Sequence, residues 1–246
     1  MDYRIILYIF FGILPSLAWL TYYLRKDPHP ESKTMILKVF LWGALVTFLV
    51  FLVQISFSKL LTALSLSPLL TDILYWFLVI AFSEEIFKYL VVKSKVLSSH
   101  VFDEPIDAMI YMIIVALGFA ALENVLYLFP SADQAGTISF NALVNRTLII
   151  TSIRFVGSTF LHTLCSGIIG YFLALSIYQA KNSKKLLFLG ILGATLLHGF
   201  YNFSIMKLDW PFQIIIPIAI LTFLAFFVIS GFERLKKIKS VCLIKT

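Results

Sequence analysis

The chain has 246 residues, of which 60 % are hydrophobic and 13 % are charged, and its mean hydropathy is +0.95. This balance excludes a soluble globular protein and indicates an integral membrane protein. The formal net charge of +7 is no sign of nucleic-acid binding, because basic loops beside anionic lipid account for it. No polar stretch is long enough for a second domain, so we expect a single polytopic membrane domain over residues 1–246.

Apolar runs separated by polar breaks predict the membrane spans in chain order. They cover about 4–24, 35–56, 68–96, 106–129, part of 141–180, 185–206 and 211–233. The first run lacks a small-residue cleavage site, so we expect it to be retained as a helix. The run 141–180 is too long for one crossing and too short for two. We expect one crossing, preceded by about a dozen residues that lie along the outer interface or bend back into the protein.

Basic residues in alternate breaks predict the topology. They follow the first, third, fifth and last spans: Arg25, Lys26, Lys33 and Lys38; Lys93 and Lys95; Lys181, Lys184 and Lys185; and Arg234, Lys236, Lys237, Lys239 and Lys245. Cytoplasmic loops are enriched in such residues. We therefore predict an all-α bundle of about seven transmembrane helices, with the N-terminus outside and the C-terminus cytoplasmic, as a multi-pass protein of the plasma membrane. An eighth span would put a basic loop or the basic tail on the wrong side.

A few ionisable side chains lie within these spans, where each costs on the order of 2.5–3.5 kcal/mol at the bilayer centre. They are Glu84, Glu85, Lys88, Glu123, Arg154, His162 and His198. Such residues should face the bundle interior and have partners. Glu84 and Lys88 are one helical turn apart with the acid first, the favourable order for an ion pair, whereas Glu85 points elsewhere. Structural roles remain open: an ion pair at Glu84, interhelical bonding by Asn124, and pairing of Arg154 with an acid.

Four of these residues should reach one depth in the membrane. Glu84 and Glu123 are equally distant in sequence from the FDEP break at 102–105, and His162 and His198 are equally distant from the break near 179–185. In a helical hairpin, equal distance from the turn means equal height. The four side chains therefore form one layer, in the outer half of the membrane if the turns lie at the inner surface.

Such a layer suits hydrolysis of an amide bond without a covalent intermediate. A buried carboxylate can act as a general base on water, and His198 with Asn202 can donate hydrogen bonds to the oxygen that becomes negative. This mechanism needs no cofactor. Zinc is the alternative, held by His162, His198 and one or two glutamates. However, the chain contains no HExxH motif.

Four ordered motifs resemble those of the PrsW family of intramembrane proteases, within the larger group of CAAX and bacteriocin-processing proteases. They are EEIFK at 84–88, GFAALEN at 118–124, FLHTLCSGIIGYFLA at 160–174 and LLHGFYNF at 196–203. The resemblance covers about 70–205, and we expect the catalytic core at about 68–206. It implies a membrane endopeptidase whose relatives are described both as metal-dependent and as glutamate-type. In the family's type protein, the enzyme makes the outer-side cut in a membrane-anchored anti-sigma factor, which belongs to a stress response.

The resemblance also implies roles for individual residues. Glu84 would activate water with Glu85 supporting it, and Lys88 ends the same motif. His198 and Asn202 resemble the oxyanion donors, and His162 fits the third motif.

The second motif departs from that of the larger group. Phe119 and Glu123 replace a Phe-x-x-x-His pattern, so Glu123 shares a proton with Glu84 or joins a metal set of Glu84, Glu123, His162 and His198.

Two other classes remain open, a membrane scaffold and a transporter. A transporter should show inverted repeats and interrupted helices, and the sequence has no clear repeat between its halves. The expected substrate of a protease is a single-span membrane protein. The sequence leaves the oligomeric state open.

Overall fold

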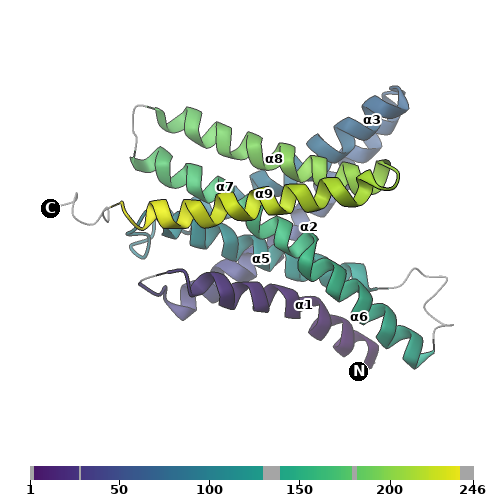
Figure 1. The fold of residues 1–246 in the computed structure, drawn as a ribbon, viewed down its shortest axis with the longest axis horizontal. Helices are drawn as coiled ribbons and strands as arrows, with labels where there is room; N and C mark the ends of the chain where they lie inside the picture. Colours follow the sequence, from purple (N-terminus) through teal and green to yellow (C-terminus); the bar gives the residue numbers. More distant parts are fainter. Residues whose placement is uncertain (1–2, 28, 130–138, 179–181, 239–246) are drawn as a thin grey trace.

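The structure, a computed structural model, describes residues 3–27, 29–129, 139–178 and 182–238. Within these ranges all regular secondary structure is helical (Figure 1). The helices are α1 (Tyr3–Leu24), α2 (Lys33–Ala63), α3 (Pro68–Leu74), η1 (Tyr75–Phe82), α4 (Ser83–Lys95), α5 (Asp107–Leu128), α6 (Phe140–Val156), α7 (Ser158–Tyr178), α8 (Ser183–Lys207) and α9 (Phe212–Leu235).

Helix α5 forms the centre of the bundle. It is buried along most of its length and packs against α1, α2 and α7. The contact with α2 is close because each helix presents a glycine to the other's backbone. A Cβ atom added at Gly118 would collide with the carbonyl oxygen of Phe40, and one added at Gly43 would collide with that of Val115. Small residues at such points let membrane helices approach each other, and dispersion contacts then hold them together.

The predicted third span is one continuous rod of three segments. Segment α3 leads into η1, which is π-helical, and η1 leads into α4, which begins immediately before the acid pair. Segment η1 packs on α8, where the ring of Phe77 lies against Gly199. A π-helical turn is uncommon and is found frequently at functional sites. The apolar run predicted the extent of this rod but not its winding.

The ambiguous run is a rod interrupted at Gly157, where φ is −99° and ψ is −101°. Helix α6, before the break, is longer than the dozen residues expected and lies beside α1 (Figure 1). Two hydrogen bonds connect them: Trp19 Nε1 donates to the Phe155 carbonyl at 2.9 Å, and Thr151 Oγ1 donates to the Phe11 carbonyl at 3.4 Å. Helix α6 thus continues the line of α7 along α1, and the segment Phe140–Ile177 counts as one candidate span.

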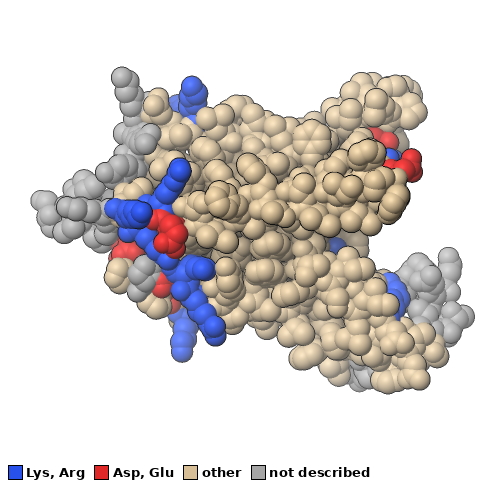
Figure 2. Space-filling model, viewed as in Figure 1, with Lys and Arg blue, Asp and Glu red and all other residues tan. Residues whose placement is uncertain are grey.

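The bundle has the surface of a membrane protein. Among the described residues six helices are long and apolar enough to cross a bilayer, and the rod from α3 to α4 is a seventh. Figure 2 shows charged side chains at the two ends of the molecule and a broad uncharged band between them. Helix α1 begins at one end and α9 finishes at the other (Figure 1), as an odd number of crossings requires. The fold is an all-helical, multi-pass membrane bundle; which end faces the cytoplasm stays a prediction.

Candidate active site

A cavity of about 470 Å³ lies between α2, η1, α4, α5, α6, α7 and α8. Its walls are mainly apolar, but they include the predicted residues Glu84, Glu123, Arg154, His162, His198 and Asn202. Four other lining side chains are more than half exposed and mark the mouth: Phe51, Tyr127, Ile153 and Met206. The surface is hollowed at the end where α3 and α6 diverge (Figure 2). The acid and imidazole groups thus share one cavity inside the bundle.

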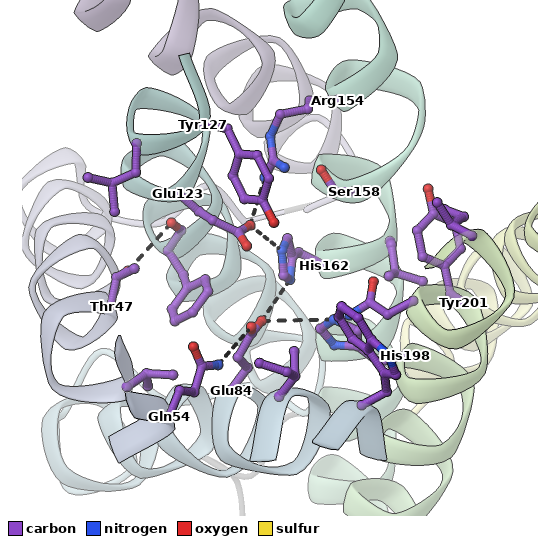
Figure 3. A pocket seen from close by; sticks show the side chains of 18 of the residues that line it. Thr47, Gln54, Glu84, Glu123, Tyr127, Arg154, Ser158, His162, His198 and Tyr201 are labelled. Atoms are coloured by element: carbon purple, nitrogen blue, oxygen red, sulfur yellow. Dashed lines mark hydrogen bonds and ion pairs between the residues drawn. The ribbon is translucent and has the colours of Figure 1, made fainter. Parts of the chain in front are cut away.

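Glu84 lies at the centre of this group, in the first turn of α4, and is 4 % exposed. Its Oε1 accepts a hydrogen bond from Gln54 Nε2 of α2 at 3.2 Å. Its Oε2 has no hydrogen-bond partner among the described residues, yet it lies 3.8 Å from His162 Nδ1 and 3.9 Å from His198 Nε2 (Figure 3). One carboxylate oxygen is therefore fixed, and the other is available to a water molecule or a ligand.

The fully buried Lys88 pairs chiefly with Glu85, not with Glu84 as the spacing suggested. Lys88 Nζ is 2.7 Å from Glu85 Oε1 and 3.7 Å from Glu84 Oε2. Lys88 follows Glu85 by three residues and Glu84 by four, and either spacing brings side chains together on a helix. In this structure the shorter contact is the one with Glu85. The ammonium also lies 4.6 Å from the centre of the Phe119 ring, a cation–π contact.

The hydrogen-bond network assigns the protons of His162. Lys88 Nζ lies 2.8 Å from His162 Nδ1, and an ammonium group can only donate. Nδ1 is therefore the acceptor, and Nε2 carries the hydrogen that it donates to Glu123 Oε2 at 2.9 Å. The ring thus connects the Glu84 motif to the Glu123 motif.

His198 is oriented by Glu85. Its Nδ1 lies 2.9 Å from Glu85 Oε1, and a carboxylate that also accepts from Lys88 can only accept, so Nδ1 carries the hydrogen. In a neutral ring, Nε2 then presents its lone pair toward Glu84. The sequence interpretation made His198 an oxyanion donor. The network instead makes the neutral ring an acceptor at Nε2, suited to take a proton or to bind a metal.

Glu123 is held by Arg154 as well as by His162. Arg154 Nη2 lies 2.7 Å from Glu123 Oε2, and Nε donates to the side-chain oxygen of Asn124. Asn124 in turn donates to the Gly12 carbonyl and to Thr159 Oγ1. These contacts give Asn124 and Arg154 the structural pairing that the sequence left open. They also provide partners for Glu123 that do not involve sharing a proton with Glu84.

The residues in this layer fit a metal ion. Glu84, His162 and His198 offer ligand atoms that all lie within 4.8 Å of one another. Each histidine has its other nitrogen on a carboxylate, Glu85 or Glu123, as metal-bound histidines commonly do. Glu123 was expected among the ligands, but it is not in this group of three and instead accepts a hydrogen bond from His162 Nε2. Lys88 would have to move away from His162 Nδ1 for that atom to bind an ion.

Sequence reasoning missed Gln54, which lies outside the expected core of 68–206. Besides binding Glu84, its Nε2 lies 3.4 Å from Ser83 Oγ. The available signal was a single amide within an apolar span, since polar side chains in spans usually bond between helices. Asn202, by contrast, lines the cavity one turn beyond His198, as predicted.

Comparisons with known proteins identify the family to which the chain belongs. A family described as "PrsW family intramembrane metalloprotease" matches residues 31–230. Proteins named Protease PrsW are 30 % identical over 82 % of this chain and 81 % of the relative in Geobacillus kaustophilus, 31 % over 78 % and 80 % in Oceanobacillus iheyensis, and 29 % over 94 % of both in Bacillus subtilis. No solved structure matches the chain. The resemblance inferred from the four motifs is confirmed: the chain belongs to the PrsW family of intramembrane proteases.

Proposed function

We propose that this protein cuts a peptide bond of a membrane-anchored protein with water activated by Glu84. The observation that carries the proposal is Glu84 Oε2, which has no hydrogen-bond partner among the described residues and faces two histidines in a cavity inside a membrane bundle. Relatives at about 30 % identity carry the name Protease PrsW. A structural ion pair would not explain why one carboxylate oxygen has no hydrogen-bond donor among the described residues.

In this mechanism Glu84 acts as a general base and then as a general acid. Oε2 takes a proton from water as the water oxygen attacks the carbonyl carbon of the substrate. The carbon–nitrogen bond then breaks, and the proton passes from Glu84 to the leaving nitrogen. Gln54 and Lys88 hold the carboxylate in place during both transfers. Asn202 supplies an amide donor for the carbonyl oxygen as it becomes negative.

A metal-dependent mechanism is the second candidate, favoured by the mutual approach of three ligand atoms. Glu84, His162 and His198 would hold the ion, and Glu85 and Glu123 would orient the two histidines. A bound divalent cation would polarise the substrate carbonyl and lower the pKa of bound water. The description of the family as a metalloprotease agrees with this candidate.

The expected substrate is a single-span membrane protein similar to an anti-sigma factor, cut near the outer surface. This expectation rests on the family resemblance and on the predicted orientation, which places the catalytic layer in the outer half of the membrane. A scaffold is the competing class. It would bind such a protein without cutting it.

The test uses the purified full chain in lipid vesicles with a panel of single-span reporter proteins. Glu84→Gln should lower kcat by about 10²- to 10⁴-fold while the variant still captures the reporter. Glu233→Gln, at a side chain that is 61 % exposed, is the matched control and should cleave normally. Cleavage that survives a strong chelator supports the glutamate mechanism, and cleavage lost to chelator and restored by zinc supports the metal. Capture of every reporter with no cleavage would establish a scaffold.

A further inference from the structure

Two cavity residues have polar atoms that the proposed chemistry does not use. Trp76 Nε1 and Ser158 Oγ are buried and have no hydrogen-bond partner among the described residues, and both side chains line the cavity that contains Glu84. An indole N–H can only donate. Native proteins rarely leave such a donor unpaired, because its desolvation then goes uncompensated. The two atoms therefore need a partner that enters the cavity.

The two donors lie on the same side of the catalytic layer. Trp76 precedes Glu84 by eight residues along one rod, and Ser158 precedes His162 by one helical turn in α7. The two rods run in the same direction through the bundle (Figure 1). At the α-helical rise of 1.5 Å per residue, Ser158 lies roughly 6 Å from the catalytic layer. Trp76 lies farther from it, but at less than about 12 Å, because the π-helical segment rises less per residue than an α-helix.

This side is also the side of the mouth. Tyr127 follows Glu123 by one turn in α5 and Met206 follows His198 by two turns in α8, and both helices run opposite to the two rods (Figure 1). Figure 3 shows the Ser158 hydroxyl on the part of the cavity wall that also holds Tyr127 and Arg154. The unpaired donors thus lie between the reacting groups and the opening.

A transmembrane substrate brings a specific need to this place. Its carbonyl groups are hydrogen-bonded within a helix, and a protease must unwind the helix locally to reach one peptide bond. The freed carbonyl groups then lie in apolar surroundings, where an unsatisfied polar group is unfavourable. An extended chain advances about 3.3 Å per residue. The two donors therefore match carbonyl groups about two to four residues from the bond that is cut.

We propose that Trp76 Nε1 and Ser158 Oγ donate hydrogen bonds to backbone carbonyl groups of the unwound substrate segment, between the catalytic layer and the cavity mouth. This inference rests on the proposed function and adds that the enzyme recognises an extended main chain. Trp76 and Ser158 are then positioning residues for the substrate and take no part in proton transfer.

The test compares Trp76→Phe and Ser158→Ala in the full chain with a reporter that the wild-type protein cleaves. Ser158→Ala loses one donor with little change of shape, and Trp76→Phe loses one donor together with part of the ring system. We expect KM to rise roughly 3- to 10-fold for each, with kcat within about twofold, because ground-state and transition-state binding weaken together. Capture of the reporter by the same variants in a Glu84→Gln background should weaken by the same factor.

The matched controls are Trp42→Phe, on α2 outside the cavity, and Thr195→Val, at a buried hydroxyl that has no described partner and does not line the cavity. Both should leave KM and kcat unchanged. An unchanged KM in Trp76→Phe and Ser158→Ala, or a fall in kcat alone, would overturn the inference. So would a loss of thermal stability that accounts for the rise in KM. If the wild-type protein cuts no reporter, the proposed function fails, and the capture assay then decides on the donors by itself.

Discussion

Two buried groups of acids in this protein are stabilised in opposite ways. In the catalytic layer, Glu85 and Glu123 contact the cations of Lys88 and Arg154. At the connections α1–α2 and α4–α5, the acids have mostly neutral donors. There the Tyr111 hydroxyl donates to Glu31 Oε2 at 2.6 Å, and the backbone N–H groups of Asp103 and Glu104 donate to Asp107 Oδ2.

The two environments act differently on the charged form of the acids. Burial raises the pKa of Glu31 and of Asp27, so the surroundings of this second group oppose the charged form of both acids. Paired ammonium and guanidinium groups instead stabilise charged carboxylates. The first group keeps such charges beside the cavity that contains Glu84. An acid-rich sequence alone does not reveal this distinction, since it depends on which cations the other helices bring.

The largest expected effect follows from removing the cation at the centre of the catalytic layer. Lys88→Met leaves Glu85 buried without its main partner, and breaking a buried pair on one side costs about 3–5 kcal/mol. We expect a large drop in the thermal unfolding temperature in detergent and loss of cleavage. The control Lys93→Met changes an exposed lysine of the same helix. Near-normal stability in Lys88→Met would mean that the layer does not depend on this charge.

Replacing Arg154 should lower the rate of cleavage and affect the stability of the fold less than replacing Lys88 does. Arg154→Gln leaves Glu123 with His162 as its main partner, and loss of a supporting residue of this kind typically lowers activity by about 10- to 100-fold. Steady-state kinetics with the reporter measures this effect. Arg154→Lys keeps a charge for Glu123 but loses the bond to Asn124, so its kcat should be intermediate. Equal activity in all three proteins would remove Arg154 from the site.

Gln54 offers a test of the orientation of Glu84. Gln54→Leu removes the donor to Oε1, and a hydrogen bond to a charged group of this kind is worth about 1.5–3 kcal/mol. We expect kcat to fall about tenfold or more with KM unchanged, since Gln54 does not need to contact the substrate. Ser56→Ala, at an exposed position of the same helix, controls for α2. A change in KM alone would contradict this role.

The smallest expected effect concerns Glu31, in the acid group at the connections between helices. Its replacement should raise the unfolding temperature, whereas the replacement of Lys88 should lower it. The raised pKa of Glu31 means that the unfolded chain loses this proton first as pH rises. Stability is therefore highest below the unfolded pKa near 4.5 and falls as pH rises toward the folded pKa. Glu31→Gln should raise the unfolding temperature by a few degrees at neutral pH and leave it unchanged near pH 4. The exposed Glu233→Gln should change neither; a loss of stability at neutral pH in Glu31→Gln would contradict the comparison.

Apolar periodicity was sufficient to predict most of the fold. Helices α1, α5, α8 and α9 lie within a few residues of the predicted spans. Helix α2 continues to Ala63, beyond the predicted end at 56, because hydroxyl side chains in its last turns satisfy themselves within the helix. Ser58 and Thr62 donate to carbonyl groups three or four residues earlier. The polar residues there look like a loop in a hydropathy pattern but remain helical.

The sequence predicted which residues meet in the cavity better than it predicted their hydrogen-bond and ion-pair partners. Equal spacing from the turns brought Glu84, Glu123, His162 and His198 to one cavity, because helical rise is uniform. The partners of Lys88 and the proton positions on His198 depend on side chains from a third helix. No spacing rule contains that information. Gln54 of α2 did leave a signal, since it is an amide within an apolar span, but the sequence does not show that its partner is Glu84.

The π-helical segment η1 makes the catalytic rod sensitive to length. Trp76 and Glu84 both reach the cavity only with the present number of residues between them. Since each residue turns a helix by a fixed angle, about 100° in an α-helix and less in a π-helix, deleting one residue between Trp76 and Glu84 would rotate Trp76 away from the cavity while leaving Glu84 in place. An insertion or deletion in this segment would therefore separate the proposed substrate donor at Trp76 from the proposed base at Glu84, whereas a substitution that keeps the length would leave both facing the cavity.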